Sequence, residues 1–133
     1  MAYLYPSIIS FFEQRMATHS QVERCTRLPV KDEYVYELLR KDGKPRVIVF
    51  LSDAYSYGLP DYVSRPKIVG TNSFILIARP EAGFDAALVA RAKNDKIGIG
   101  GIGKMMGAIN YNRVYEYQTT NEKREKKLSH SRA

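Results

Sequence analysis

The sequence predicts one small α/β domain built on a central mixed sheet of about four strands flanked by helices, in the order α-β-β-β-α-β. The length of 133 residues and the 44% hydrophobic content suit one continuous core and leave too little chain for two domains. The segments 47–51 and 74–78 are apolar on both sides of a strand, which is typical of central strands covered by helices on both faces. Segments with apolar residues three to four positions apart precede and follow these runs, as expected of the covering helices.

The first half of the chain is expected to form a helix and a hairpin. Pro6 suits the first turn of a helix, and apolar residues recur at helical spacing from position 8 to about position 19. A polar stretch, 20–27, then connects this helix to the alternating segment 33–40, which predicts a strand. The Asp-Gly pair at positions 42 and 43 favours a tight turn into a second strand at 46–51.

The second half adds a long loop and the remaining elements. Gly, Pro and Tyr residues dominate 54–71, which predicts turns with one helical turn near 61–64, and 74–78 follows as a strand. We expect a helix at 84–94, a glycine–isoleucine segment at 97–103, a short helix at 104–109 and a last strand at 113–117. The predicted domain spans 1–117, and the charged segment 118–133 is predicted to be a flexible tail.

Net charge favours a polyanionic partner. Lys and Arg number 21 against 14 acidic residues, so the chain carries +7 with a pI near 9.5. Such a surplus attracts nucleic acid through counterion release. The tail holds +3 of this charge and the body only +4, so a charged surface that serves solubility is the alternative interpretation.

Location is predicted from three features. The apolar runs are far shorter than the roughly 20 residues that span a bilayer, so no membrane association is expected. The N-terminus shows no export signal, and the single Cys25 cannot form an internal disulfide. We therefore expect a cytoplasmic protein.

The segment from Gly98 to Lys104 fits both a dinucleotide-binding and a phosphate-loop pattern in part. A phosphate loop needs Ser or Thr after its lysine to hold magnesium, and Met105 stands there. Two other interpretations stay open: the glycines let the backbone pack closely, or the exposed amides and Lys104 contact a nucleic-acid phosphate. No cofactor is expected.

Carboxylates offer the strongest case for catalysis. Asp53 follows one central strand, Asp61 lies in the next loop, and Glu81 follows the next central strand. We expect these side chains to meet at one edge of the sheet as catalytic residues, with Asp53 and Glu81 as ligands of Mg²⁺ or Mn²⁺. The alternative is that they are ordinary turn and cap residues.

The order of elements over residues 6–117 resembles the core of the restriction-endonuclease-like superfamily of nucleases. In that family an acid on the second core strand and a Glu-x-Lys on the third hold the metal, sometimes with a glutamate from the first helix. Asp53 corresponds to the first acid and Glu13 to the helical glutamate, but 74–78 contains no Glu-x-Lys. The resemblance therefore implies a nuclease-like scaffold that binds nucleic acid without efficient cutting. The alternative is a metal-dependent nuclease with a diverged carboxylate site.

Aromatic and basic residues occur together in two places, as in proteins that stack bases and contact phosphates. The predicted nucleic-acid contacts are Tyr55, Tyr57, Tyr62, Arg65 and Lys67 in the long loop, and Lys104, Asn110 and Arg113 after the glycine segment. A third interpretation is an interaction module whose long loop meets a protein partner or a second copy of the chain.

Overall fold

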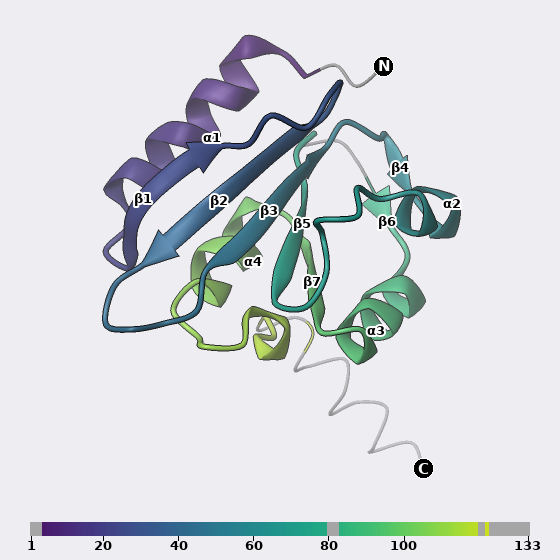
Figure 1. Cartoon of the computed structure of the whole chain (residues 1–133). Coiled ribbons are helices and arrows are strands. Elements are labelled where there is room, and N and C mark those ends of the chain that lie inside the picture. Colours follow the sequence, from purple (N-terminus) through teal and green to yellow (C-terminus); the bar gives the residue numbers. More distant parts are fainter. Residues whose placement is uncertain (1–3, 80–82, 120–121, 123–133) are drawn as a thin grey trace.

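A five-stranded mixed sheet forms the centre of the protein (Figure 1). The structure is a computed structural model that describes residues 4–79, 83–119 and 122. The strands of this sheet lie in the order β1-β2-β3-β5-β7, and a separate two-stranded sheet pairs β4 with β6. The elements are α1 (Pro6–Thr18), β1 (Val22–Arg27), β2 (Tyr34–Arg40), β3 (Val47–Ser52), β4 (Ser56–Tyr57), α2 (Leu59–Val63), β5 (Ser73–Ile77), β6 (Gly83–Phe84), α3 (Ala86–Asn94), β7 (Ile97–Gly100), α4 (Ile102–Ala108) and the 3-10 helix η1 (Val114–Glu116).

The direction of strand pairing in the sheet changes at β3. Strands β1, β2 and β3 pair antiparallel, whereas β3, β5 and β7 pair parallel. Helices α1 and α4 cover one face, and α2 and α3 cover the other. The predicted small α/β domain with a mixed sheet is confirmed.

Both faces of the central strands are buried, as their sequence predicts. On β3, Val49 and Leu51 pack on the α1 side, while Ile48 and Phe50 pack on the α2 side. All six residues of β3 and all five of β5 are buried. Two hydrophobic clusters therefore share one sheet.

Strand β1 lies in the polar stretch that was predicted to be a connection. It is one of the two edge strands of the sheet, and Val22 is its only buried residue. An edge strand whose side chains face solvent needs few apolar residues. Strand β1 therefore lacks the alternation of apolar and polar residues that marks a half-buried strand. The pairing with β2 comes from backbone hydrogen bonds, which the sequence pattern does not display.

The predicted last strand at 113–117 is wrong. This segment forms η1, in which the Glu116 N–H donates to the Arg113 carbonyl at 3.1 Å. Val114 is buried and donates its N–H to Asn72 Oδ1 at 3.0 Å. The Val114 N–H is thus satisfied by the Asn72 side chain and not by a neighbouring strand.

The glycines of β7 make room for close packing. Ile97 and Ile99 face the α3 side, and the alternate positions Gly98 and Gly100 face α4. A Cβ on Gly98 would lie 2.7 Å from the Phe74 ring, closer than real carbon atoms approach. The packing interpretation is therefore confirmed for Gly98 and Gly100, whereas Gly101 and Gly103 have open space where a Cβ would lie.

No helix among the described residues is long and apolar enough to cross a membrane. The predicted tail lies outside the described residues, apart from 118–119 and 122.

Arg40 at the end of β2 is a buried charge, with 5% of its surface exposed. Its Nε donates to the Pro45 carbonyl at 2.8 Å, and its guanidinium also donates to the carbonyls of Ile109, Tyr111 and Asn112. Burial lowers the pKa of this guanidinium. Arg40 thus ties the hairpin to the segment that follows α4.

We expect Arg40→Met to lower the free energy of unfolding by about 3 kcal/mol, because it leaves several carbonyls without a donor. The control is Arg46→Met, which removes an exposed ion pair with Glu37 and should cost about 0.5 kcal/mol or less. Urea denaturation followed by circular dichroism measures both. Equal transition midpoints for the two variants would contradict the role of Arg40.

Candidate functional site

The carboxyl ends of β3, β5 and β7 lie at one edge of the sheet because these strands run parallel. Asp53 follows β3, Ala78 and Arg79 follow β5, and Gly101 follows β7. Ligands of open α/β sheets bind at this edge. Of the depressions at this edge, two lie mainly on opposite faces of the sheet and are described below.

The first depression, called here the aromatic groove, lies on the side of α1 and α4 and has a volume of about 480 Å³. Its lining includes Ile8, Phe11, Leu76, Arg79, Phe84 and Ile102. Two of these rings are exposed to solvent, Phe11 to 44% and Phe84 to 41%. An apolar floor with exposed rings at its margin is suited to flat, hydrophobic groups.

Arginines lie over aromatic rings beside this groove. The Arg79 guanidinium carbon is 4.2 Å from the centroid of the Tyr55 ring and 6.0 Å from that of Tyr5. Arg79 Nε also donates to the carbonyl of Asp53, which holds the side chain at the sheet edge. On α1, Arg15 lies 5.1 Å from the centroid of Phe11. The Phe11 and Tyr55 rings therefore each have a guanidinium over one face.

The second depression, called here the acidic pocket, lies on the side of α2 and has a volume of about 220 Å³. Its lining includes Glu33, Asp53, Asp61, Tyr57, Ser64 and Arg65. Burial raises the pKa of Glu33, and the nearby charge of Asp53 raises it further. The structure thus brings together two of the three predicted catalytic acids, Asp53 and Asp61, and adds Glu33.

The acids also have structural roles. Asp61 Oδ2 accepts the Gly58 N–H at 2.9 Å and so caps the start of α2. Among the described residues no group of three or more His, Cys, Asp or Glu side chains is placed to hold a metal ion. Glu81 lies outside the described residues, so the metal site that includes it stays a prediction.

Two of the loop tyrosines cannot stack on a bound base. Tyr57 and Tyr62 are exposed to only 2% and 1%. The Tyr62 hydroxyl donates to Asp95 Oδ2 at 2.5 Å, and burial together with this carboxylate raises its pKa to about 12. Tyrosines in a loop can be core residues when the loop itself folds. The sequence predicted a helical turn near 61–64, close to α2, but not β4. Tyr55, at 61% exposure, is available for stacking.

The basic residues of the same loop are divided. Arg65 donates from Nε to the Val69 carbonyl at 2.9 Å and from Nη1 to the Tyr62 carbonyl at 3.0 Å. Lys67 is exposed. Arg65 therefore holds the loop together, whereas the exposed Lys67 side chain can contact a phosphate group of a ligand.

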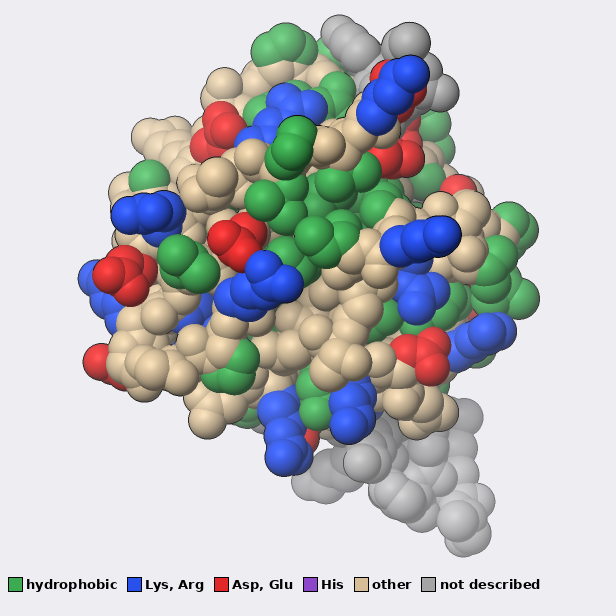
Figure 2. Space-filling view, in the orientation of Figure 1, with side chains coloured by type: hydrophobic (Ala, Val, Ile, Leu, Met, Phe, Trp, Pro, Cys, Tyr) green, Lys and Arg blue, Asp and Glu red, His purple; other side chains and the backbone are tan. Residues whose placement is uncertain are grey.

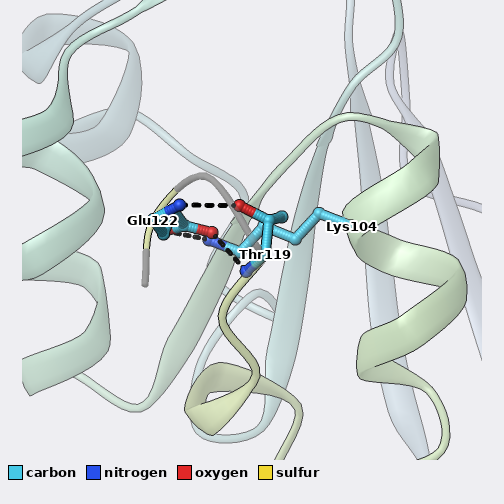
Figure 3. Close-up of polar contacts among 3 residues, drawn as sticks. All are labelled: Lys104, Thr119 and Glu122. Atoms are coloured by element: carbon cyan, nitrogen blue, oxygen red, sulfur yellow. Dashed lines mark hydrogen bonds and ion pairs between the residues drawn. The ribbon is translucent and has the colours of Figure 1, made fainter. Parts of the chain in front are cut away.

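Lys104 is occupied by an ion pair (Figure 3). Its Nζ lies 3.1 Å from Glu122 Oε2, and its side chain is 10% exposed. Thr119 and Glu122 form a reciprocal cap, since the Thr119 N–H donates to Glu122 Oε1 and the Glu122 N–H donates to Thr119 Oγ1. We therefore leave Lys104 out of the nucleic-acid interface, in contrast to the sequence-based hypothesis.

The other predicted contacts of that cluster lie at the opposite edge of the sheet. Asn110 and Arg113 are exposed beside the carbonyls that Arg40 binds, near the amino ends of the parallel strands. Arg113 Nη1 lies 3.2 Å from Glu116 Oε1. The structure does not bring these residues to the aromatic groove.

The residues that sequence reasoning missed are Phe11, Arg15, Arg79 and Phe84. Phe11 stands next to the apolar stripe of α1, and Phe84 begins the segment predicted as a helix. The sequence pattern at these positions does not distinguish an exposed aromatic ring from a buried one. Their spatial separation from the core was visible only in the fold.

Charge is scattered on the face shown in Figure 2. Lys and Arg side chains there lie among acidic ones around an apolar patch, and the coloured residues of this face form no continuous basic surface. A ligand that approaches this face therefore meets no broad positive field.

No family model, no curated protein and no solved structure matches this chain. The resemblance to restriction-endonuclease-like nucleases stays a prediction.

Glu122 gives stability that depends on pH. Burial alone would raise its pKa, but the Thr119 N–H and Lys104 outweigh burial and lower it. The contribution is therefore complete above the ordinary glutamate pKa of roughly 4.3 and is lost as pH falls through the lower folded value. We expect wild type to be about 1 kcal/mol more stable than Glu122→Gln at pH 7 and to have a smaller advantage at pH 3. Urea denaturation at both pH values measures this, and an unchanged difference would contradict the ion pair.

Proposed function

We propose that the chain binds single-stranded nucleic acid through the aromatic groove. The observation that carries this proposal is the set of exposed rings at the groove, Phe11 and Phe84 in its lining and Tyr55 against Arg79, which also lines it. Every base has an apolar face that stacks on such rings, and Arg15, exposed beside Phe11, can contact a phosphate.

The shape of the groove supports bases as the ligand. Its volume of about 480 Å³ falls within the range of roughly 300–1,000 Å³ typical of small-molecule sites. A duplex hides the faces of its bases, so an aromatic groove favours unpaired nucleotides. The net charge of +7 adds a salt-dependent attraction that acts on any sequence.

Binding without cutting is the form of this function that we favour. Strands β3 and β5 contain no Glu or Lys, so neither supplies the Glu-x-Lys that the nuclease resemblance requires. A specific observation favours the alternative, a diverged metal-dependent nuclease, because Asp53 and Asp61 line one pocket with Glu33. Manganese-dependent cleavage that Asp53→Asn abolishes would establish the alternative.

A cytoplasmic location fits this function and the single cysteine. Burial, with the charge of Glu13, raises the pKa of the Cys25 thiol to about 11. Such a thiol stays protonated at neutral pH and reacts slowly. The proposed site of action is therefore a reducing compartment, and the proposed partner there is nucleic acid.

We expect Phe11→Ala with Tyr55→Ala to weaken the binding of a labelled single-stranded oligonucleotide by about ten-fold or more, because each lost stacking contact is worth roughly 1–3 kcal/mol. Fluorescence anisotropy at two salt concentrations, with DNA and RNA probes, measures the affinity. The matched control is Tyr111→Ala, which removes a ring of 45% exposure at the opposite edge of the sheet and should leave affinity unchanged.

Three results would reject the proposal. They are equal weakening by Tyr111→Ala, preference for duplex over single strands, and no salt-sensitive binding to any probe. The last result would direct attention to a protein partner or a second copy of the chain as the occupant of the groove.

A further inference from the structure

The acidic pocket is separate from the aromatic groove and differs from it in chemistry. Phe50 and Tyr57 of its lining belong to the core cluster on the α2 and α3 side of the sheet. The aromatic groove is lined by Phe12 and Leu76 from the opposite cluster. A ligand of one site therefore need not occupy the other.

The carboxylates in this pocket come from three different elements. Glu33 precedes β2, Asp53 follows β3 and Asp61 lies in α2. Arg65 also lines the pocket, but two of its nitrogens donate to the main-chain carbonyls of Val69 and Tyr62. Three acids thus share the pocket with one arginine that is partly used by the loop.

Like charges in this pocket repel one another. Burial raises the pKa of Glu33 first, and Asp53 raises it further. Asp61 acts in the same way on the buried Tyr57 hydroxyl, whose pKa is raised by burial and then by the Asp61 charge. A bound cation would relieve both effects.

The Tyr57 hydroxyl is a second and independent sign of a ligand. Its side chain lines the pocket and is 2% exposed, and its oxygen has no hydrogen-bond partner among the described residues. Buried hydroxyl groups are nearly always hydrogen-bonded, because an unpaired one costs free energy. The hydroxyl interacts electrostatically with Asp61 and Arg65, which also line the pocket, so it lies beside the groups that a ligand there would meet.

The spacing of the acids decides which cation fits. A divalent metal needs oxygen ligands that converge on one point at roughly 2.0–2.6 Å. The described residues contain no group of three acids placed in this way. A guanidinium has five N–H donors in a plane and no acceptor, so it reaches oxygens that lie apart.

We propose that the acidic pocket binds a guanidinium group, with Glu33 and Asp61 accepting its N–H groups and the Tyr57 hydroxyl oxygen accepting another. The volume of about 220 Å³ suits such a head group and lies below the range of roughly 300–1,000 Å³ for larger ligands. The guanidinium belongs to free arginine-like molecules or to an arginine side chain of a peptide.

The first test titrates the protein with methylguanidinium and follows backbone amide shifts by NMR. We expect saturable shifts at residues 33, 57 and 61. Glu33→Gln should weaken binding by about ten-fold, the effect of losing one charge-assisted hydrogen bond. The matched control is Glu23→Gln, an exposed acid on β1, which should leave the affinity unchanged.

Tyr57→Phe separates a ligand role from a structural one. It removes a hydroxyl that has no described partner, so the free energy of unfolding should not fall, while methylguanidinium should bind about three-fold more weakly. A fall in stability with unchanged affinity would show that the hydroxyl serves the fold and would overturn the proposal.

Parallel titrations distinguish the ligands. Tighter binding of an arginine-containing tripeptide than of N-acetyl-arginine amide would support a peptide source, and the reverse order would support a small molecule. Shifts at residues 33, 57 and 61 with Mg²⁺ and none with methylguanidinium would overturn the proposal in favour of a metal site. Shifts confined to other residues would also overturn it.

Discussion

Burial of β3 and β5 on both faces is the constraint on which the rest of the structure depends. Every residue of these strands is buried, so helices must cover both sides of the sheet. The connection through α2 and the connection through α3 return the chain to run parallel to β3, which places the carboxyl ends of β3, β5 and β7 together. The candidate sites lie at that edge because the loops there are not part of the packed layers.

The same edge presents different chemistry on its two sides. On the α1 and α4 side, exposed rings and the Arg79 guanidinium border an apolar groove. On the α2 side, carboxylates and a buried hydroxyl line a small polar pocket. The segment after β3 borders both, since Asp53 lines the acidic pocket and its carbonyl accepts from Arg79, which lines the aromatic groove. One short segment thus supports both sites.

Several basic side chains serve the fold, so net charge overstates the charge available to a partner. Arg40 binds four carbonyls, Arg65 holds the loop around α2, and Lys104 pairs with Glu122. These groups satisfy main-chain oxygens or acids that would otherwise be left without donors. The total of +7 is therefore a poor measure of the charge that a partner would meet.

The sequence by itself determined the α/β class, the helix that starts at Pro6, the hairpin and the two central strands, because burial on one or both faces leaves a periodic apolar pattern. Only the tertiary structure revealed β1, whose edge position needs no such pattern, and η1, where an Asn72 side chain replaces a strand partner. It also decided that Tyr57 is buried and Tyr55 exposed, although both stand in one loop of similar composition. Residue type states what a side chain can do, whereas its neighbours, which come from distant parts of the chain, decide whether it packs, pairs or binds.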